Sequence, residues 1–154
     1  MKLKTFITAV FIPLAVGALS ALATGGSMAN FALINKPPLS PPAWLFPVVW
    51  TILYILMGIA SYLVITSGAD SQKIKKAISF YAIQLVFNFF WSIIFFNLEM
   101  YFFAAVWLVA LFILVIYTTV LFYDISKNAA YLMIPYIIWL AFALYLNIGI
   151  FLLN

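Results

Sequence analysis

The stretch from Met100 to Tyr123, MYFFAAVWLVALFILVIYTTVLFY, contains no charged side chain and no proline. A helix needs about 20 consecutive apolar residues to cross the hydrocarbon core of a bilayer, so this stretch predicts a complete transmembrane helix. Transmembrane β-strands would instead appear as segments of about 10 residues with alternating polarity. The fold class predicted from this stretch is therefore an all-α integral membrane protein.

Outward from this stretch, the chain contains four more apolar segments of similar length. The connection at residues 24–43 is long and rich in proline, and its four closely spaced prolines cannot lie inside a helix. Residues 68–76 are expected to form a short basic loop, and short links make neighbouring helices antiparallel. We expect a single domain over residues 1–154, a five-transmembrane-helix bundle. The expected helices cover residues 5–23, 44–66, 77–98, 100–123 and 129–153.

The composition of the whole chain agrees with a lipid environment. Of its 154 residues, 69% are hydrophobic and 6% are charged, whereas an average soluble domain is about 25% charged. The chain has no Cys and no His, which removes disulfides, thiolate nucleophiles and the usual ligands of zinc and haem iron. We therefore expect no metal and no cofactor. The net charge of +4 indicates membrane topology and not nucleic-acid binding.

The lysines indicate the orientation of the helices. If all five helices cross the membrane, only Lys36 falls on one side, and the positive-inside rule makes that side the outer one. The N-terminus is then cytoplasmic, the C-terminus lies outside, and residues 24–43 form an outer loop. One alternative stays open, because Ala21-Leu22-Ala23 after a basic start and an apolar run also resembles a signal-peptide cleavage site. The lysines on the cytoplasmic side are Lys2, Lys4, Lys73, Lys75, Lys76 and Lys127.

Amides and indoles in the middle of the expected helices mark faces that point away from lipid. Gln84, Asn88, Trp91 and Phe95 follow one another at spacings of four, three and four residues, so they share one helix face. Mid-span amides are costly against hydrocarbon, and this face should point into the bundle. The two amides either hold neighbouring helices together or belong to a ligand site.

Two other helices carry comparable faces. Phe46, Trp50 and Tyr54 are spaced by four residues in one of them, and Trp139 and Ala143 begin the corresponding face of the last helix. A pocket lined mostly by aromatic side chains suits a large planar apolar ligand. The outer loop is placed to cover the mouth of such a pocket. The alternative is a scaffold in which these aromatic side chains only pack.

The first helix carries a different pattern. Pro13, Gly17, Ala21 and Gly25 follow one another at intervals of four residues. Small residues on one face allow another helix to approach the backbone closely. We expect this face to serve close helix packing, with contact to a flat ligand as the alternative.

The tryptophan-bearing segments resemble a known family. The segment Pro41–Tyr54, PPAWLFPVVWTILY, followed by Met57-Gly58, resembles the signature of the tryptophan-rich sensory protein and translocator protein family, TspO/MBR. This family is also called the peripheral-type benzodiazepine receptor family. Its patterns for the third and fifth helices are similar to Gln84-Leu85, Asn88, Trp91 and Phe95-Phe96, and to Pro135-Tyr136, Trp139, Phe142 and Leu146-Asn147.

The resemblance implies a membrane receptor or sensor, a bacterial member located in the plasma membrane and forming a homodimer among membrane lipids. It implies binding of porphyrins such as protoporphyrin IX, and of benzodiazepine-type or isoquinoline carboxamide ligands, in an intramembrane pocket. Lys36, or loop backbone amides, would meet the porphyrin carboxylates. The candidate ligand-binding residues are Phe46, Trp50, Tyr54, Asn88, Trp91, Phe95, Trp139, Phe142, Ala143 and Leu146.

Two alternative functions stay open at this point. One is light-dependent porphyrin degradation, in which Trp50 and Trp139 would donate electrons; the other is transport of tetrapyrroles or lipids. An enzyme is the less favoured class, because no acid–base or nucleophilic set is visible. The chain also departs from the family pattern. Asn30 and Phe31 stand where Trp-Tyr is common, and Val48 stands where the motif proline usually lies.

Overall fold

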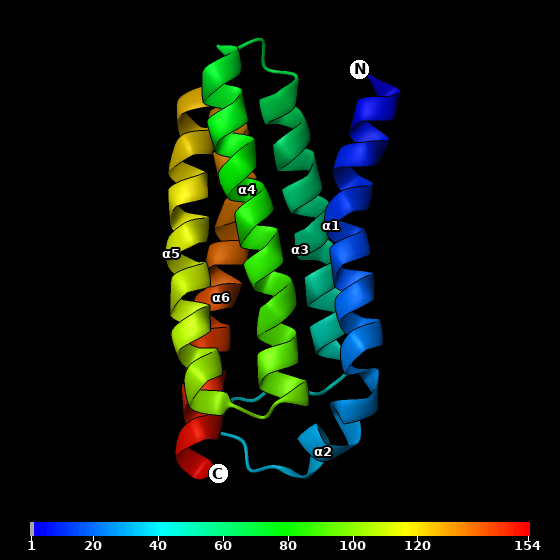
Figure 1. Ribbon diagram of the computed structural model, residues 1–154, viewed down its shortest axis with the longest axis vertical. Coiled ribbons are helices and arrows are strands. Elements are labelled where there is room, and N and C mark those ends of the chain that lie inside the picture. Colours follow the sequence, from blue (N-terminus) through cyan, green and yellow to red (C-terminus); the bar gives the residue numbers. More distant parts are fainter. Residues whose placement is uncertain (1) are drawn as a thin grey trace.

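Five long helices run side by side in the computed structural model, which describes residues 2–154 (Figure 1). The first long helix, α1, continues through the short helices η1 (Gly25–Ser27) and α2 (Met28–Leu33). The third long helix, α4, ends in the π-helical segment η2 (Ile93–Asn97). Within the described residues, five helices are long and apolar enough to cross a membrane, which confirms the predicted fold class. The long helices are α1 (Leu3–Thr24), α3 (Leu45–Ile65), α4 (Ser71–Ser92), α5 (Tyr101–Ile125) and α6 (Lys127–Leu153).

The helices form a ring whose order differs from the order in the sequence. α1 packs on α3, α3 on α6, α6 on α5, and α5 on α4. A less extensive contact between α4 and α1 closes the ring, and in Figure 1 these two helices diverge toward the N-terminal end. The last helix therefore lies between α3 and α5, and the weakest seam of the bundle lies between α1 and α4.

Three connections differ from expectation because helices begin earlier or continue further. Asp70 accepts hydrogen bonds from the backbone N–H groups of Gln72 and Lys73, at 3.2 and 3.3 Å, and such a cap starts a helix. The expected basic loop over 68–76 is thus mostly the first turns of α4. Ser126 caps α6 in the same way and is the single residue between α5 and α6. The expected loop over 24–43 begins with η1 and α2.

The irregular segment between α2 and α3, residues 34–44, is attached to the end of α6. Asn35 and Asn154 exchange two hydrogen bonds, at 3.1 and 2.8 Å, and the Tyr145 hydroxyl donates to the carbonyl of Pro38 at 2.6 Å. Pro37 is buried, and a Cβ atom at Gly149 would lie 2.5 Å from its Cγ. Gly149 therefore lets the loop rest directly on α6.

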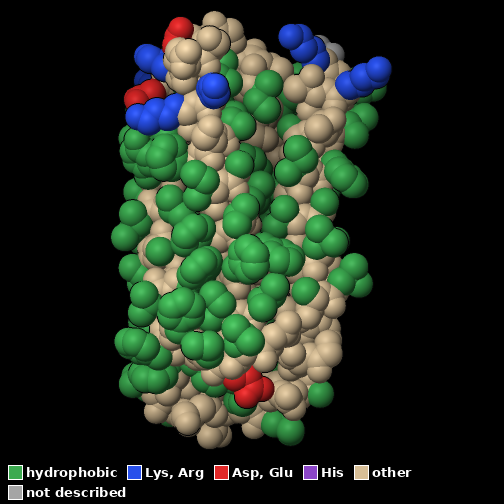
Figure 2. All heavy atoms as spheres, in the orientation of Figure 1, with side chains coloured by type: hydrophobic (Ala, Val, Ile, Leu, Met, Phe, Trp, Pro, Cys, Tyr) green, Lys and Arg blue, Asp and Glu red, His purple; other side chains and the backbone are tan. Residues whose placement is uncertain are grey.

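The surface of the bundle separates charge from apolar area. Figure 2 shows lysines gathered at the end that carries the N-terminus, while hydrophobic side chains cover the sides between the two ends. Many large hydrophobic side chains on these sides are exposed, among them Phe11, Ile113 and Ile138. Such a surface suits hydrocarbon as the solvent along the length of the helices.

Backbone contact between α1 and α3 depends on Gly58. A Cβ atom at this position would lie 2.6 Å from Val10 Cα and 2.8 Å from the carbonyl oxygen of Ala9. The expected small-residue face of α1 is used only in part. The ring of Tyr54 lies against Gly17, whereas nothing would lie within 4 Å of a Cβ atom at Gly25.

We expect Gly58→Ala to lower the thermal unfolding midpoint of the protein in detergent, followed by circular dichroism. The added methyl group meets backbone atoms that cannot rotate away, and overpacking of this kind costs about 1–3 kcal/mol. Gly25→Ala is the matched control, since the same methyl group meets open space and alanine favours the helix. Equal midpoints for the two variants would show that α1 and α3 are not in backbone contact at Gly58.

Candidate functional site

A chain of hydrogen bonds joins α3, α4 and α6 in the buried centre of the bundle. The Tyr54 hydroxyl donates to Asn88 Oδ1 at 2.7 Å, and Asn88 Nδ2 donates to the Tyr136 hydroxyl oxygen at 2.8 Å. Tyr136 in turn donates to Gln84 Oε1 at 2.8 Å, and Gln84 Nε2 lies 3.8 Å from Met57 Sδ. All five side chains are buried. The predicted inward face of α4 therefore binds α3 and α6, across the ring of helices, through its amides.

Five candidate rings come together next to this chain, on its loop side. Trp50 stacks on Tyr54, with centroids 5.6 Å apart, and meets Trp139 edge to face at 6.4 Å. Trp139 also contacts Phe46 at 5.9 Å and Phe142 at 5.5 Å. We call these five residues of α3 and α6 the α3/α6 aromatic cluster. It brings together residues that are about 90 positions apart in the sequence.

Two other candidates, Trp91 and Phe95, belong to a second group of rings where α4 passes into η2. Trp91 stacks on Phe95 at 5.2 Å, and Phe31 of α2 lies 6.0 Å from Phe95. The indole N–H of Trp91 donates to Asn147 Oδ1 at 3.1 Å. Asn147 shares a face of α6 with Trp139. The last two candidates, Ala143 and Leu146, are buried on the same face of α6, between the two groups.

Three residues that complete these groups were not among the candidates: Tyr136, Asn147 and Phe31. Tyr136 precedes Trp139 by three positions, so helical spacing alone could have included it. Phe31 could not be found in this way, because α2 was not expected inside the loop. Lys36 does not face the α3/α6 aromatic cluster: its Nζ donates to the carbonyls of Phe31 and Ile34, at 2.9 and 3.3 Å.

The indole N–H of Trp139 is the unusual polar group of the cluster. Nε1 is buried and has no hydrogen-bond partner within residues 2–154, whereas the indoles of Trp91 and Trp107 donate to Asn147 Oδ1 and to the carbonyl of Phe87. A buried donor without a partner costs roughly 1–3 kcal/mol. Trp139 therefore holds a donor that an acceptor on a ligand could satisfy.

The side chains of the α3/α6 aromatic cluster limit the kinds of contact that a ligand could make with it. The cluster offers aromatic faces, one phenol and one unpaired indole N–H, and its members carry no ionised group at neutral pH. Within the described residues, no group of three or more His, Cys, Asp or Glu side chains could hold a metal ion. Stacking and hydrogen bonding are thus the interactions available to a ligand here.

The model of the TspO/MBR family matches residues 9–153. The chain belongs to the TspO/MBR family. It is 39% identical over 155 residues to the tryptophan-rich protein TspO of Archaeoglobus fulgidus, covering 100% of this chain and 99% of that protein. It is 40% identical over 124 residues to TspO of Chlorobaculum tepidum, covering 80% and 78% of the two chains. The human translocator protein is 37% identical over 124 residues, with coverages of 80% and 73%.

The match confirms the resemblance seen in the three tryptophan-bearing segments. It extends over the two elements in which the sequence departs from the family pattern, α2 and the start of α3. This TspO/MBR protein is accordingly a membrane protein of the sensor and translocator family. The three helices that carry the candidate residues, α3, α4 and α6, all lie inside the matched range.

Replacing Asn88 tests whether the buried hydrogen bonds hold this TspO/MBR bundle together. We expect Asn88→Leu to lower the unfolding midpoint, because it leaves the Tyr54 hydroxyl without its acceptor. In a double-mutant cycle with Tyr54→Phe, the coupling should be about 1 kcal/mol, as found for hydrogen bonds between membrane helices. Tyr131→Phe is the control, since this tyrosine is 57% exposed. If the losses of unfolding free energy in Asn88→Leu and Tyr54→Phe were additive in the double variant, the hydrogen bond between the two side chains would be contradicted.

Proposed function

We propose that this protein is a membrane receptor or sensor that binds a planar aromatic ligand of the porphyrin type at the α3/α6 aromatic cluster. The observation that carries the proposal is the buried Trp139 N–H, which has no partner within residues 2–154 and is surrounded by aromatic rings. Aromatic pairs add about 0.5–1.5 kcal/mol beyond area burial. A planar ligand with one acceptor at its edge would use both features.

Several ligand classes satisfy this description. The carboxylates of protoporphyrin IX are hydrogen-bond acceptors, and so are the carbonyl groups of benzodiazepine-type ligands and isoquinoline carboxamides. In each case the ring system would stack on Trp50 or Trp139, and the acceptor would accept a hydrogen bond from the indole N–H of Trp139. Metal-free porphyrin is favoured over haem, because the chain has no His or Cys to serve as an axial ligand.

Binding requires the cluster to open. Trp50 and Trp139 already contact each other edge to face at 6.4 Å, so a ligand that stacks between them has to separate them. The outer loop covers this end of the bundle and is attached to α6 by Asn35 and Tyr145. Release of Lys36 from the Phe31 carbonyl would free its charge for a ligand carboxylate.

We further propose that the N-terminus is cytoplasmic and the C-terminus outside, in a bacterial plasma membrane. The gathering of lysines at the N-terminal end of the bundle supports this orientation (Figure 2). The site then opens toward the outer side, under the loop. A homodimer, which the family resemblance implies, is also part of the proposal, and the exposed apolar sides of the helices leave room for a partner.

A second function is favoured by one observation, the contact between two indoles. Trp50 and Trp139 are oxidisable rings within 6.4 Å of each other, and both would lie beside a bound porphyrin. A porphyrin excited by light could take an electron from either indole. Light-dependent degradation of the porphyrin is therefore the alternative to simple binding.

We expect Trp139→Phe to weaken binding of protoporphyrin IX about ten-fold, measured by titration of the porphyrin absorbance. This variant keeps an aromatic ring but loses the N–H and part of the stacking area of the indole. One hydrogen bond of about 1 kcal/mol corresponds to about five-fold, and the smaller ring adds to the loss. Trp107→Phe is the matched control, since its indole N–H already donates to the Phe87 carbonyl. Wild-type affinity in both Trp139→Phe and a Trp50→Ala, Trp139→Ala double variant would remove the cluster as the site.

Illumination of the porphyrin complex separates binding from degradation. If the indoles donate electrons, a new absorbing product should form in the wild type and fall severalfold in the Trp50→Phe, Trp139→Phe double variant. Trp44→Phe serves as the control, because Trp44 is 67% exposed at the start of α3. Product formation that is the same in all three proteins would exclude a role for the two indoles, and no product in any of them would leave binding as the function.

A further inference from the structure

A cavity lies away from the α3/α6 aromatic cluster, in the seam between α1 and α4 at the lysine-bearing end. Its volume is about 380 Å³, and its walls come from α1, α3 and α4. Figure 2 shows a furrow between α1 and α4 at this end of the surface. The volume falls in the range of small-molecule sites, about 300–1,000 Å³. The aromatic cluster contributes no residue to the lining of this cavity.

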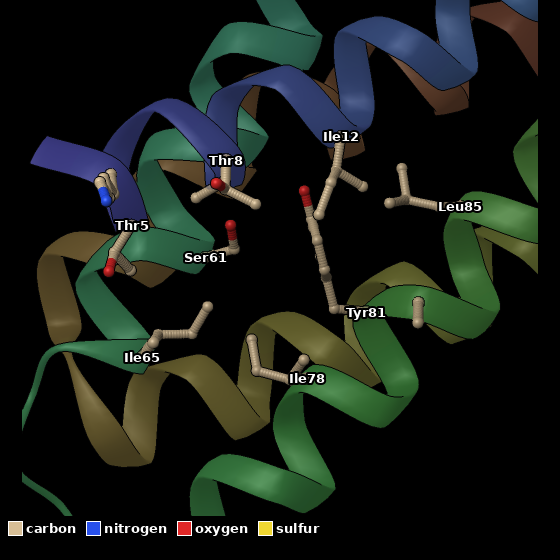
Figure 3. A pocket seen from close by; sticks show the side chains of 11 residues that line it. Thr5, Thr8, Ile12, Ser61, Ile65, Ile78, Tyr81 and Leu85 are labelled. Carbon is tan, nitrogen blue, oxygen red and sulfur yellow. The ribbon is translucent and has the colours of Figure 1, made fainter.

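The floor of the cavity carries a buried hydroxyl group without a partner. Tyr81 is 5% exposed, and its hydroxyl has no hydrogen-bond partner within residues 2–154. Figure 3 shows the Tyr81 ring pointing into the hollow, with Thr8 and Ser61 on the opposite wall. The Ser61 hydroxyl donates a hydrogen bond to the carbonyl of Gly58, at 2.8 Å. The Tyr81 hydroxyl is thus a donor covered in the wall of the cavity, beside Ser61, and a molecule in the cavity reaches it when this wall shifts.

The lining changes in polarity with depth. On α1, Lys4, Thr8 and Ile12 follow one another at intervals of one turn along the same face, so a cation, a hydroxyl and a hydrocarbon side chain succeed one another toward the middle of the bilayer. On α4, the deepest lining residue is Leu85. A phospholipid presents its groups in the same order: an anionic phosphate, ester carbonyls and an acyl chain.

We propose that this cavity binds one acyl chain and the ester region of an anionic phospholipid from the lysine-side leaflet. Lys4 receives the phosphate, the Tyr81 hydroxyl donates to an ester carbonyl, and the acyl chain lies between Ile12 and Leu85. The second chain stays in the bilayer, because the seam opens between α1 and α4. The site is independent of the proposed porphyrin site, since the two share no lining residue.

The test uses the full chain in nanodiscs of phosphatidylcholine with or without phosphatidylglycerol. Retained lipid is counted by native mass spectrometry after release into detergent. We expect phosphatidylglycerol to be retained about five-fold over phosphatidylcholine, the effect of one lysine at a membrane surface. Lys4→Gln should abolish this preference. Lys73→Gln, at the same end but outside the lining of the cavity, should keep it.

Two further variants test the interior of the cavity with a phosphatidylglycerol that carries a photoreactive acyl chain. Labelling of α1 and α4 peptides should fall about five-fold in Tyr81→Phe, the loss of one hydrogen bond. It should disappear in Ala82→Phe, which fills the mouth from an exposed position. Tyr117→Phe and Ala141→Phe, at exposed positions on α5 and α6, should label as the wild type does.

Three results would overturn the proposal. Labelling spread evenly over all five long helices would show contact with bulk lipid only. Unchanged labelling in Tyr81→Phe and Ala82→Phe would exclude the cavity as the binding site. Equal retention of the two lipids by the wild type would remove the role of Lys4. Circular dichroism of each variant verifies that the bundle is folded before the lipid is counted.

Discussion

The bundle depends on the amide of Asn88, which binds a tyrosine of α3 and a tyrosine of α6 at the same time. In hydrocarbon an unpaired polar group costs several kcal/mol, so the protein has to satisfy its own polar side chains. Tyr54, Asn88, Tyr136 and Gln84 do this by forming one continuous chain of hydrogen bonds. That chain sets the distance between three helices and thereby the place where Trp50 and Trp139 meet.

The sequence predicts the helices well because hydrophobic length is a direct physical requirement of the bilayer. It predicts the inward faces for a similar reason, since Asn88 and Gln84 are too costly against lipid. The start of α4 was missed because the cap at Asp70 is a local interaction among polar residues, and a count of apolar residues does not detect it. The contribution of Phe31 was missed because α2 lies within a proline-rich stretch.

Two properties of the candidate site could not be read from the sequence at all. Trp91 and Trp139 look equivalent in the sequence, yet the Trp91 indole N–H has an acceptor in Asn147 and the Trp139 N–H has none within residues 2–154. The difference arises from how α4 and α6 face each other, which spacing along one helix does not determine. Likewise, no pattern in the chain indicates that Tyr81, whose ring packs on Phe122, would carry a buried hydroxyl without a partner within residues 2–154.

The one-residue link at Ser126 limits how the bundle can move. α5 and α6 are joined there by a single residue, and the other end of α6 holds the segment 34–44 through Asn35 and Tyr145. α6 is thus restrained at both ends, while α1 meets α4 along a weak seam. The least restrained place in the bundle is therefore the seam between α1 and α4. A ligand bound at the proposed site would therefore have to move α3 away from α6, and this movement would strain the hydrogen bonds that Asn88 makes to Tyr54 and Tyr136.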